Sequence, residues 1–122
     1  MNPIQYQVKA RLTQNPELHC PMIIKPKFLM LLNGALGLAG ESGEVVDHVK
    51  KAVFHGHQID GGYMIEELGD ILWYIALICD AMNISLDYVM DRNIDKLERR
   101  YHGNFTTDKS VNRNNETNHD YD

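Results

Sequence analysis

Four carboxylates stand in two pairs of identical spacing. Glu41 and Glu44 are three residues apart, and so are Glu67 and Asp70. Residues at this spacing share one face of a helix, where like charges repel by about 0.2–0.5 kcal/mol. A hard cation between two such pairs would turn the repulsion into attraction, and Mg²⁺ prefers oxygen ligands while keeping several waters. We therefore predict a Mg²⁺ site built from these four carboxylates, in which Mn²⁺ can substitute.

Two other interpretations of the acidic pairs remain open at this stage. Either pair alone is more typical of a solvated helix face than of a metal site. A metal site is indicated because two such pairs occur on consecutive helices, each beside a strongly apolar stripe. A di-iron bundle would need Glu-x-x-His on two helices. His48 follows Glu44 by four residues instead, and no comparable histidine follows Glu67 or Asp70. The pattern favours magnesium over iron.

Cationic and aromatic residues are spaced to join the same site. Lys51 shares the helix face of Glu41 and Glu44, so it could reach a metal-held phosphate, although it could equally be an exposed lysine near a helix end. Tyr74 follows Asp70 by four residues, where its ring could stack on a nucleobase or belong to the core. A triphosphate carries about four negative charges, more than one divalent ion neutralises. The other substrate-binding candidates lie in the last helix: Asn93, Lys96, Arg99 and Arg100.

Apolar periodicity predicts helices and no strands. The helices are expected over residues 2–13, 27–54, 63–82 and about 86–101, with a proline-containing loop at 15–26. Gly56 is expected to end the second helix, Asp60-Gly61-Gly62 to form a turn, and Ser85 to cap the last helix. The chain is predicted to be one all-α domain, residues 1–102, resembling a small four-helix bundle. Residues 103–122 are polar and are expected to form a flexible tail.

Composition excludes several classes of function. The 122 residues carry a formal net charge of -5, which argues against nucleic acid or an anionic membrane as partner. Cys20 and Cys79 have no metal-binding spacing, and no apolar stretch is long enough to span a membrane. We expect a soluble, cytoplasmic protein. Two helices this apolar are difficult to cover within one chain, so a homodimer or homotetramer is expected.

Two segments together resemble a known enzyme family. Residues 37–45 read GLAGESGEV and residues 65–74 read IEELGDILWY. This ExxE, spacer, ExxD pattern resembles the MazG-like members of the all-α nucleotide pyrophosphohydrolase superfamily, which also includes all-α dUTPases, dCTPases and phosphoribosyl-ATP pyrophosphohydrolases. With the last helix included, the resemblance covers about residues 30–105. Many relatives read EExxE, whereas this chain has Gly40 before its first ligand.

The resemblance implies a reaction and assigns roles. The family cleaves the bond between the α- and β-phosphates of a nucleoside triphosphate, NTP or dNTP, giving a monophosphate and pyrophosphate. By resemblance the four carboxylates would bind magnesium, Lys96 with Arg99 or Arg100 would contact phosphate, and Tyr74 would line the base pocket. Either Glu41 or Glu44 would accept the proton of the attacking water. The alternative is a non-catalytic helical module for oligomerisation or for regulatory nucleotide binding.

Overall fold

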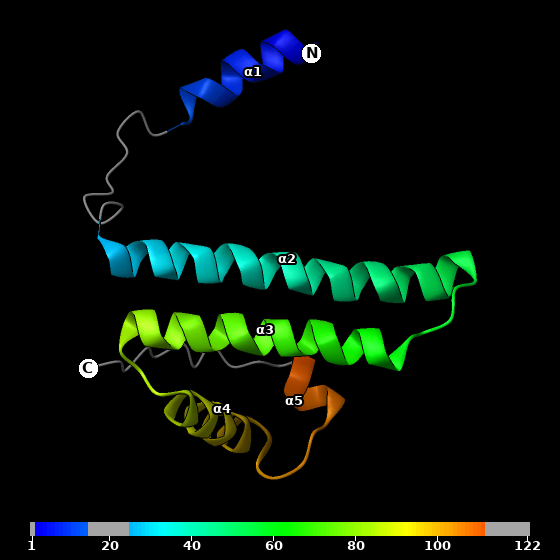
Figure 1. Ribbon diagram of the computed structural model, residues 1–122, viewed down its shortest axis with the longest axis vertical. Coiled ribbons are helices and arrows are strands. Elements are labelled where there is room, and N and C mark those ends of the chain that lie inside the picture. The colour runs from blue at the N-terminus through cyan, green and yellow to red at the C-terminus, as the bar shows by residue number, and fades with distance from the viewer. Residues whose placement is uncertain (1, 15–24, 112–122) are drawn as a thin grey trace.

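A computed structural model describes residues 2–14 and 25–111, and within those ranges all regular structure is helical, as the sequence predicts. The elements, shown in Figure 1, are α1 (Pro3–Leu12), α2 (Pro26–His55), α3 (Gly61–Met82), α4 (Leu86–Tyr101) and α5 (Thr107–Val111). Four of these match the expected helices to within two residues. The expected loop at 15–26 lies mostly outside the described residues.

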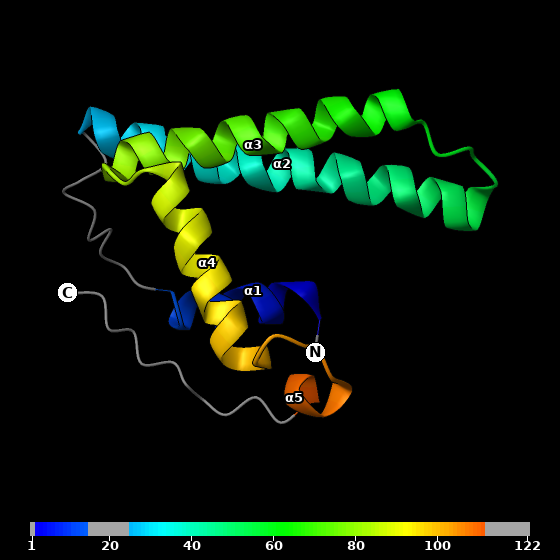
Figure 2. The ribbon, with the colours of Figure 1, turned by 90° about the horizontal axis from the view of Figure 1, so that it is seen from below.

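The centre of the fold is an antiparallel hairpin of α2 and α3, which lie side by side in both views (Figures 1 and 2). Glycines allow the two backbones to approach. A Cβ atom on Gly34 would meet Ile78 at 2.6 Å, and one on Gly37 would meet the Tyr74 ring at 2.1 Å. The glycines that weaken α2 as an isolated helix therefore serve its packing. Near the open end of the hairpin, Lys27 donates to Asn83 at 2.8 Å.

The turn between α2 and α3 is fixed by its capping residues. Gly56 ends α2 in the left-handed conformation at φ 73°, as predicted. Asp60 is the N-cap of α3, and its Oδ1 accepts from the amides of Gly62 (2.8 Å) and Tyr63 (3.3 Å). The turn predicted at Asp60-Gly61-Gly62 is therefore wrong for the two glycines, because the Asp60 cap draws them into the first turn of α3.

The remaining helices do not close a bundle around this hairpin. α4 leaves the end of α3 at 103° (Figure 2), and among the described residues only α2 and α3 pack extensively on each other. Ser85 occupies the N-cap position of α4 as expected, but its side chain makes no capping hydrogen bond there. Part of the expected tail is helical, since α5 falls within it, and residues 112–122 are not described.

Much apolar surface consequently remains uncovered. Within the described ranges only Gly34 and Cys79 are buried, and Cys79 is a free thiol. Ile65 is 73% exposed, Leu72 59% and Trp73 58%. No single described helix is long and apolar enough to cross a membrane; α3 and α4 pass that test only as a bent pair, by length and composition. The described part of a single chain thus supplies a packed pair of helices but very little core.

Candidate metal and phosphate site

Three of the four predicted ligands converge on the hairpin. Glu41 lies near the middle of α2, while Glu67 and Asp70 lie three residues apart in the first half of α3. One carboxylate oxygen from each lies within 4.8 Å of the other two. Glu41 and Glu67 are half-buried and Asp70 is exposed, so the cluster opens toward solvent on one side. The antiparallel arrangement brings the two sequence motifs together.

The electrostatics of this cluster are unfavourable without a cation. Burial raises the pKa of Glu41, and its hydrogen bond to Glu67 and the charges of Glu67, Asp70 and Glu44 raise it further. Two oxygens bound to one Mg²⁺ at about 2.1 Å lie at most about 4.2 Å apart. Only one trans pair reaches that separation, and cis ligands lie about 3 Å apart. The three oxygens, which lie within 4.8 Å of one another, would therefore have to draw together by up to about 1.8 Å to bind one ion. The donor set therefore suits a hard divalent cation.

Glu44, the fourth predicted ligand, is placed differently. Its side chain is exposed and lies outside the three-carboxylate cluster. Its Oε2 accepts a hydrogen bond of 3.2 Å from the hydroxyl of Tyr63, in the first turn of α3. Burial, with hydrogen bonds to Glu67 and Glu44, raises the pKa of Tyr63 to about 12, so this hydroxyl remains a donor at neutral pH. Glu44 is thus connected to the cluster through a tyrosine.

Lys51 lies on the face of α2 that carries Glu41 and Glu44, as expected, and its side chain forms an ion pair with a neighbouring carboxylate. Its ammonium pairs with Asp47, one turn earlier, which also pairs with Lys50. These hydrogen bonds lower the pKa of Asp47 to about 2 and raise the pKa of Lys51, to which the charge of Glu44 also contributes. Lys51 is more than a third exposed and lies about two helical turns beyond Glu44, toward the turn that joins α2 to α3.

Tyr74 occupies the interface between α2 and α3. Its ring lies against the backbone of Gly37, and the Trp73 ring meets it edge-on with centroids 4.9 Å apart. Of the two roles left open by the sequence, this position suits packing, while the half-exposed ring keeps some surface for a base. Gly37 is thus the residue that determines where the Tyr74 ring lies.

The cationic residues of α4 are not brought to the carboxylates by this chain. Because α4 diverges from α3 and packs extensively on neither hairpin helix, its polar candidates lie on an exposed helix. These residues are Asn93, Lys96, Arg99 and Arg100. Any contact between them and a phosphate at the acidic cluster would require another copy of the chain or a change in the position of α4.

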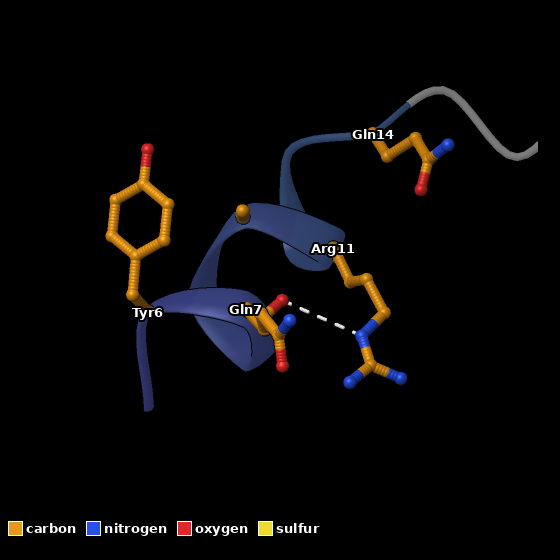
Figure 3. Close-up of a pocket in the computed structure, with 5 residues that line it drawn as sticks. Tyr6, Gln7, Arg11 and Gln14 are labelled. Carbon is orange, nitrogen blue, oxygen red and sulfur yellow. Dashed lines mark hydrogen bonds between the residues drawn. The ribbon is translucent and has the colours of Figure 1, made fainter. Parts of the chain in front are cut away.

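A hollow of about 480 Å³ lies on α1 and is lined by five residues (Figure 3), which are Tyr6, Gln7, Ala10, Arg11 and Gln14. Arg11 donates there to the carbonyl of Gln7 at 3.4 Å. It holds no carboxylate and is formed by a single exposed helix and the residues that follow it, so it does not compete with the acidic cluster as a candidate active site.

Two residues of the site were not predicted from the sequence. Tyr63 contacts Glu44, and His48 stacks on the Tyr63 ring with centroids 4.7 Å apart and planes at 29°. Their spacing held a signal, because Tyr63 precedes Glu67 by four residues and His48 follows Glu44 by four. Each therefore shares a helix face with a ligand. What the spacing does not reveal is that these two faces meet.

Comparison with known proteins identifies the family of this chain. The model of the MazG nucleotide pyrophosphohydrolase domain matches residues 32–105, which include both acidic pairs and α4. The chain belongs to this family. It is also 36% identical over 72 residues to the Gene 37 protein of Mycobacterium phage L5, an alignment covering 53% of this chain and 60% of the phage protein. No solved structure matches significantly.

Proposed function

We propose that the protein is a Mg²⁺-dependent nucleoside triphosphate pyrophosphohydrolase. The observation that carries the proposal is the convergence of Glu41, Glu67 and Asp70 from two helices of a chain that belongs to the MazG family. Three acids so close together are electrostatically costly unless a cation and its ligand occupy the site. A polyphosphate held by the metal is the substrate that this donor set suits best.

In the proposed reaction, water adds across the bond between the α- and β-phosphates, releasing a nucleoside monophosphate and pyrophosphate. Glu41, Glu67 and Asp70 would hold the metal, which when bound neutralises phosphate charge and lowers the pKa of coordinated water. We assign Glu44 as acceptor of the water's proton, because it lies beside the cluster but outside it. Its Oε2 accepts from Tyr63, so Oε1 would be the oxygen that accepts the proton.

Lys51 would place its positive charge near the substrate phosphates. Its ammonium would give up part of its ion pair with Asp47 when the substrate binds. Tyr74 would present the exposed part of its ring to the base. Neither assignment specifies a particular base or sugar, so the substrate class is nucleoside and deoxynucleoside triphosphates as a whole.

Product analysis tests this function. Each common NTP and dNTP is incubated with the protein and Mg²⁺, and the products are followed by ³¹P NMR. The proposal predicts equal amounts of monophosphate and pyrophosphate from at least one nucleotide, and no reaction in EDTA. Formation of diphosphate and orthophosphate, or no hydrolysis of any nucleotide, would contradict it.

A nucleotide-binding protein without turnover is the second candidate, and Gly40 favours it. Many relatives carry an acid at this position, and a Cβ atom on Gly40 would meet nothing within 4 Å, so the fold leaves room for the missing side chain. Saturable nucleotide binding by calorimetry, with no product detected by NMR, would support this second candidate over the enzyme.

We also propose that the protein acts as a homodimer or homotetramer. Exposed apolar residues on α2, α3 and α4, such as Val46, Leu72 and Met90, are more than half exposed in the single chain. Burial against a second copy would complete a helical bundle and could bring the cations of α4 to a neighbouring acidic cluster. Sedimentation velocity should show a dimer or tetramer at micromolar concentration. A monomer at all concentrations would contradict this assembly.

A further inference from the structure

The last turns of α2 and the first turn of α3 are joined by a connected set of side-chain contacts. The backbone amide of Asp60 donates to His48 Nε2 at 2.9 Å. The Asp60 side chain caps α3 and thereby fixes the backbone of Tyr63. The His48 ring stacks on the Tyr63 ring, and the Tyr63 hydroxyl donates to Glu44. The set of contacts therefore links His48 to Glu44, one helical turn earlier on α2, through Asp60 and Tyr63 of the neighbouring segment.

Each contact restricts a different degree of freedom of Tyr63. The Asp60 cap holds its backbone, and the stacked imidazole restricts rotation of its ring. The tyrosine is half-buried and so is His48, whereas Glu44 is exposed. An exposed glutamate would otherwise sample several side-chain rotamers. The one polar contact that the described structure gives the Glu44 carboxylate therefore comes from a group whose own position is well determined.

We propose that Tyr63 is a positioning residue that holds the Glu44 carboxylate beside the three-acid cluster, and that His48 orients Tyr63 for this task. The inference rests on the proposed function, in which Glu44 acts on the attacking water. The hydroxyl engages one oxygen of Glu44 and also faces Glu67, so it fixes the fourth acid relative to the other three. Supporting contacts of this kind around a metal site typically change activity or metal affinity by about 10- to 100-fold.

The decisive variant is Tyr63→Phe, which keeps the ring on His48 and removes only the hydroxyl. We expect kcat to fall by about 10- to 100-fold with KM changed less than about threefold. Tyr6→Phe, on exposed α1, is the matched control and should leave both constants unchanged. His48→Ala should reproduce part of the loss, because the ring of Tyr63 is then free to rotate. A Tyr63→Phe enzyme with the kcat of the wild type would overturn the proposal.

A double-mutant cycle separates positioning from a general structural role. Glu44→Asp withdraws the carboxylate from the tyrosine by one methylene group while keeping its charge. In that background Tyr63→Phe should cost less than about twofold in kcat, because the contact it removes is already lost. An equal loss in both backgrounds would mean that Tyr63 acts without Glu44, and would overturn the proposal.

Metal affinity gives a readout that does not depend on turnover. If the wild type hydrolyses no nucleotide, the proposed function has failed, and Mg²⁺ binding by calorimetry then decides the positioning role. Because the Tyr63 hydroxyl also faces Glu67, one of the three proposed ligands, Tyr63→Phe should bind Mg²⁺ about tenfold more weakly than the wild type, and Tyr6→Phe should bind it equally well. If the wild type is inactive and Tyr63→Phe binds Mg²⁺ with the same affinity as the wild type, the inference is overturned.

Discussion

Gly37→Ala tests the packing of α2 against α3. The added Cβ would lie 2.1 Å from the Tyr74 ring, and ordinary contact begins near 3.4 Å, so the ring must move by about 1.3 Å. Overpacking of this kind costs about 1–3 kcal/mol. Alanine in place of glycine contributes about 0.5–1 kcal/mol of helix stability in return. The matched control is Gly40→Ala, where the new methyl group meets nothing within 4 Å and only the gain remains.

The two variants should therefore differ by about 1–3 kcal/mol in the free energy of unfolding. For roughly 100 ordered residues, 1 kcal/mol corresponds to about 5 °C in Tm, so Gly37→Ala should melt about 5–15 °C below Gly40→Ala. Thermal unfolding followed by circular dichroism in EDTA measures this without metal. With Tyr74→Ala as background, Gly37→Ala should stabilise as Gly40→Ala does. Equal Tm values for both variants in the wild-type background would refute the packing argument.

Three further predictions concern the metal, a surface carboxylate and a helix cap. Mg²⁺ at 100 times its Kd should stabilise the folded protein by about 2.7 kcal/mol, and Glu67→Gln should lose most of this gain in a thermal melt. Because pairing with two lysines lowers the pKa of Asp47 from its ordinary 3.8 to about 2, its contribution is complete above pH 3.8 and is lost as pH falls through 2. The Tm difference between wild type and Asp47→Asn should accordingly narrow from pH 4 to pH 2, and a constant difference would contradict the pairing. Asp60→Ala removes a cap with two hydrogen bonds and should cost about 1 kcal/mol in urea unfolding, whereas Ser85→Ala, which removes no such bond, should cost less than about 0.5 kcal/mol.

The helices of this protein are predictable from local sequence because their determinants are local. Apolar periodicity identifies α2, α3 and α4, and Gly56 marks the end of α2 by a backbone conformation that glycine adopts readily. The same conformational freedom of glycine makes the Gly61-Gly62 pair misleading, because both residues lie in the first turn of α3. Glycines favour a turn, but Oδ1 of Asp60 accepts from the amides of Gly62 and Tyr63, and this cap outweighs that preference. The short α5 carries no apolar periodicity from which it could have been predicted.

The site is predictable only in part, since its determinants lie on two helices. Spacing identifies Glu41, Glu67 and Asp70, and the hairpin brings them together. Spacing also groups Glu44 with them, whereas the register of the two helices places Tyr63 beside it instead. The angle of 103° at which α4 leaves α3 is not contained in the apolar periodicity of either helix.

The acidic cluster is proposed to support hydrolysis of nucleotides between the α- and β-phosphates, and one set of variants tests this most directly. Initial rates of pyrophosphate release with Mg²⁺ should be compared for the wild type, Glu67→Gln and the neighbouring exposed Glu66→Gln. We expect a loss of at least about 100-fold for Glu67→Gln and a rate within about twofold of wild type for Glu66→Gln, with unchanged helical circular dichroism in both. Turnover by Glu67→Gln close to that of the wild type would contradict it.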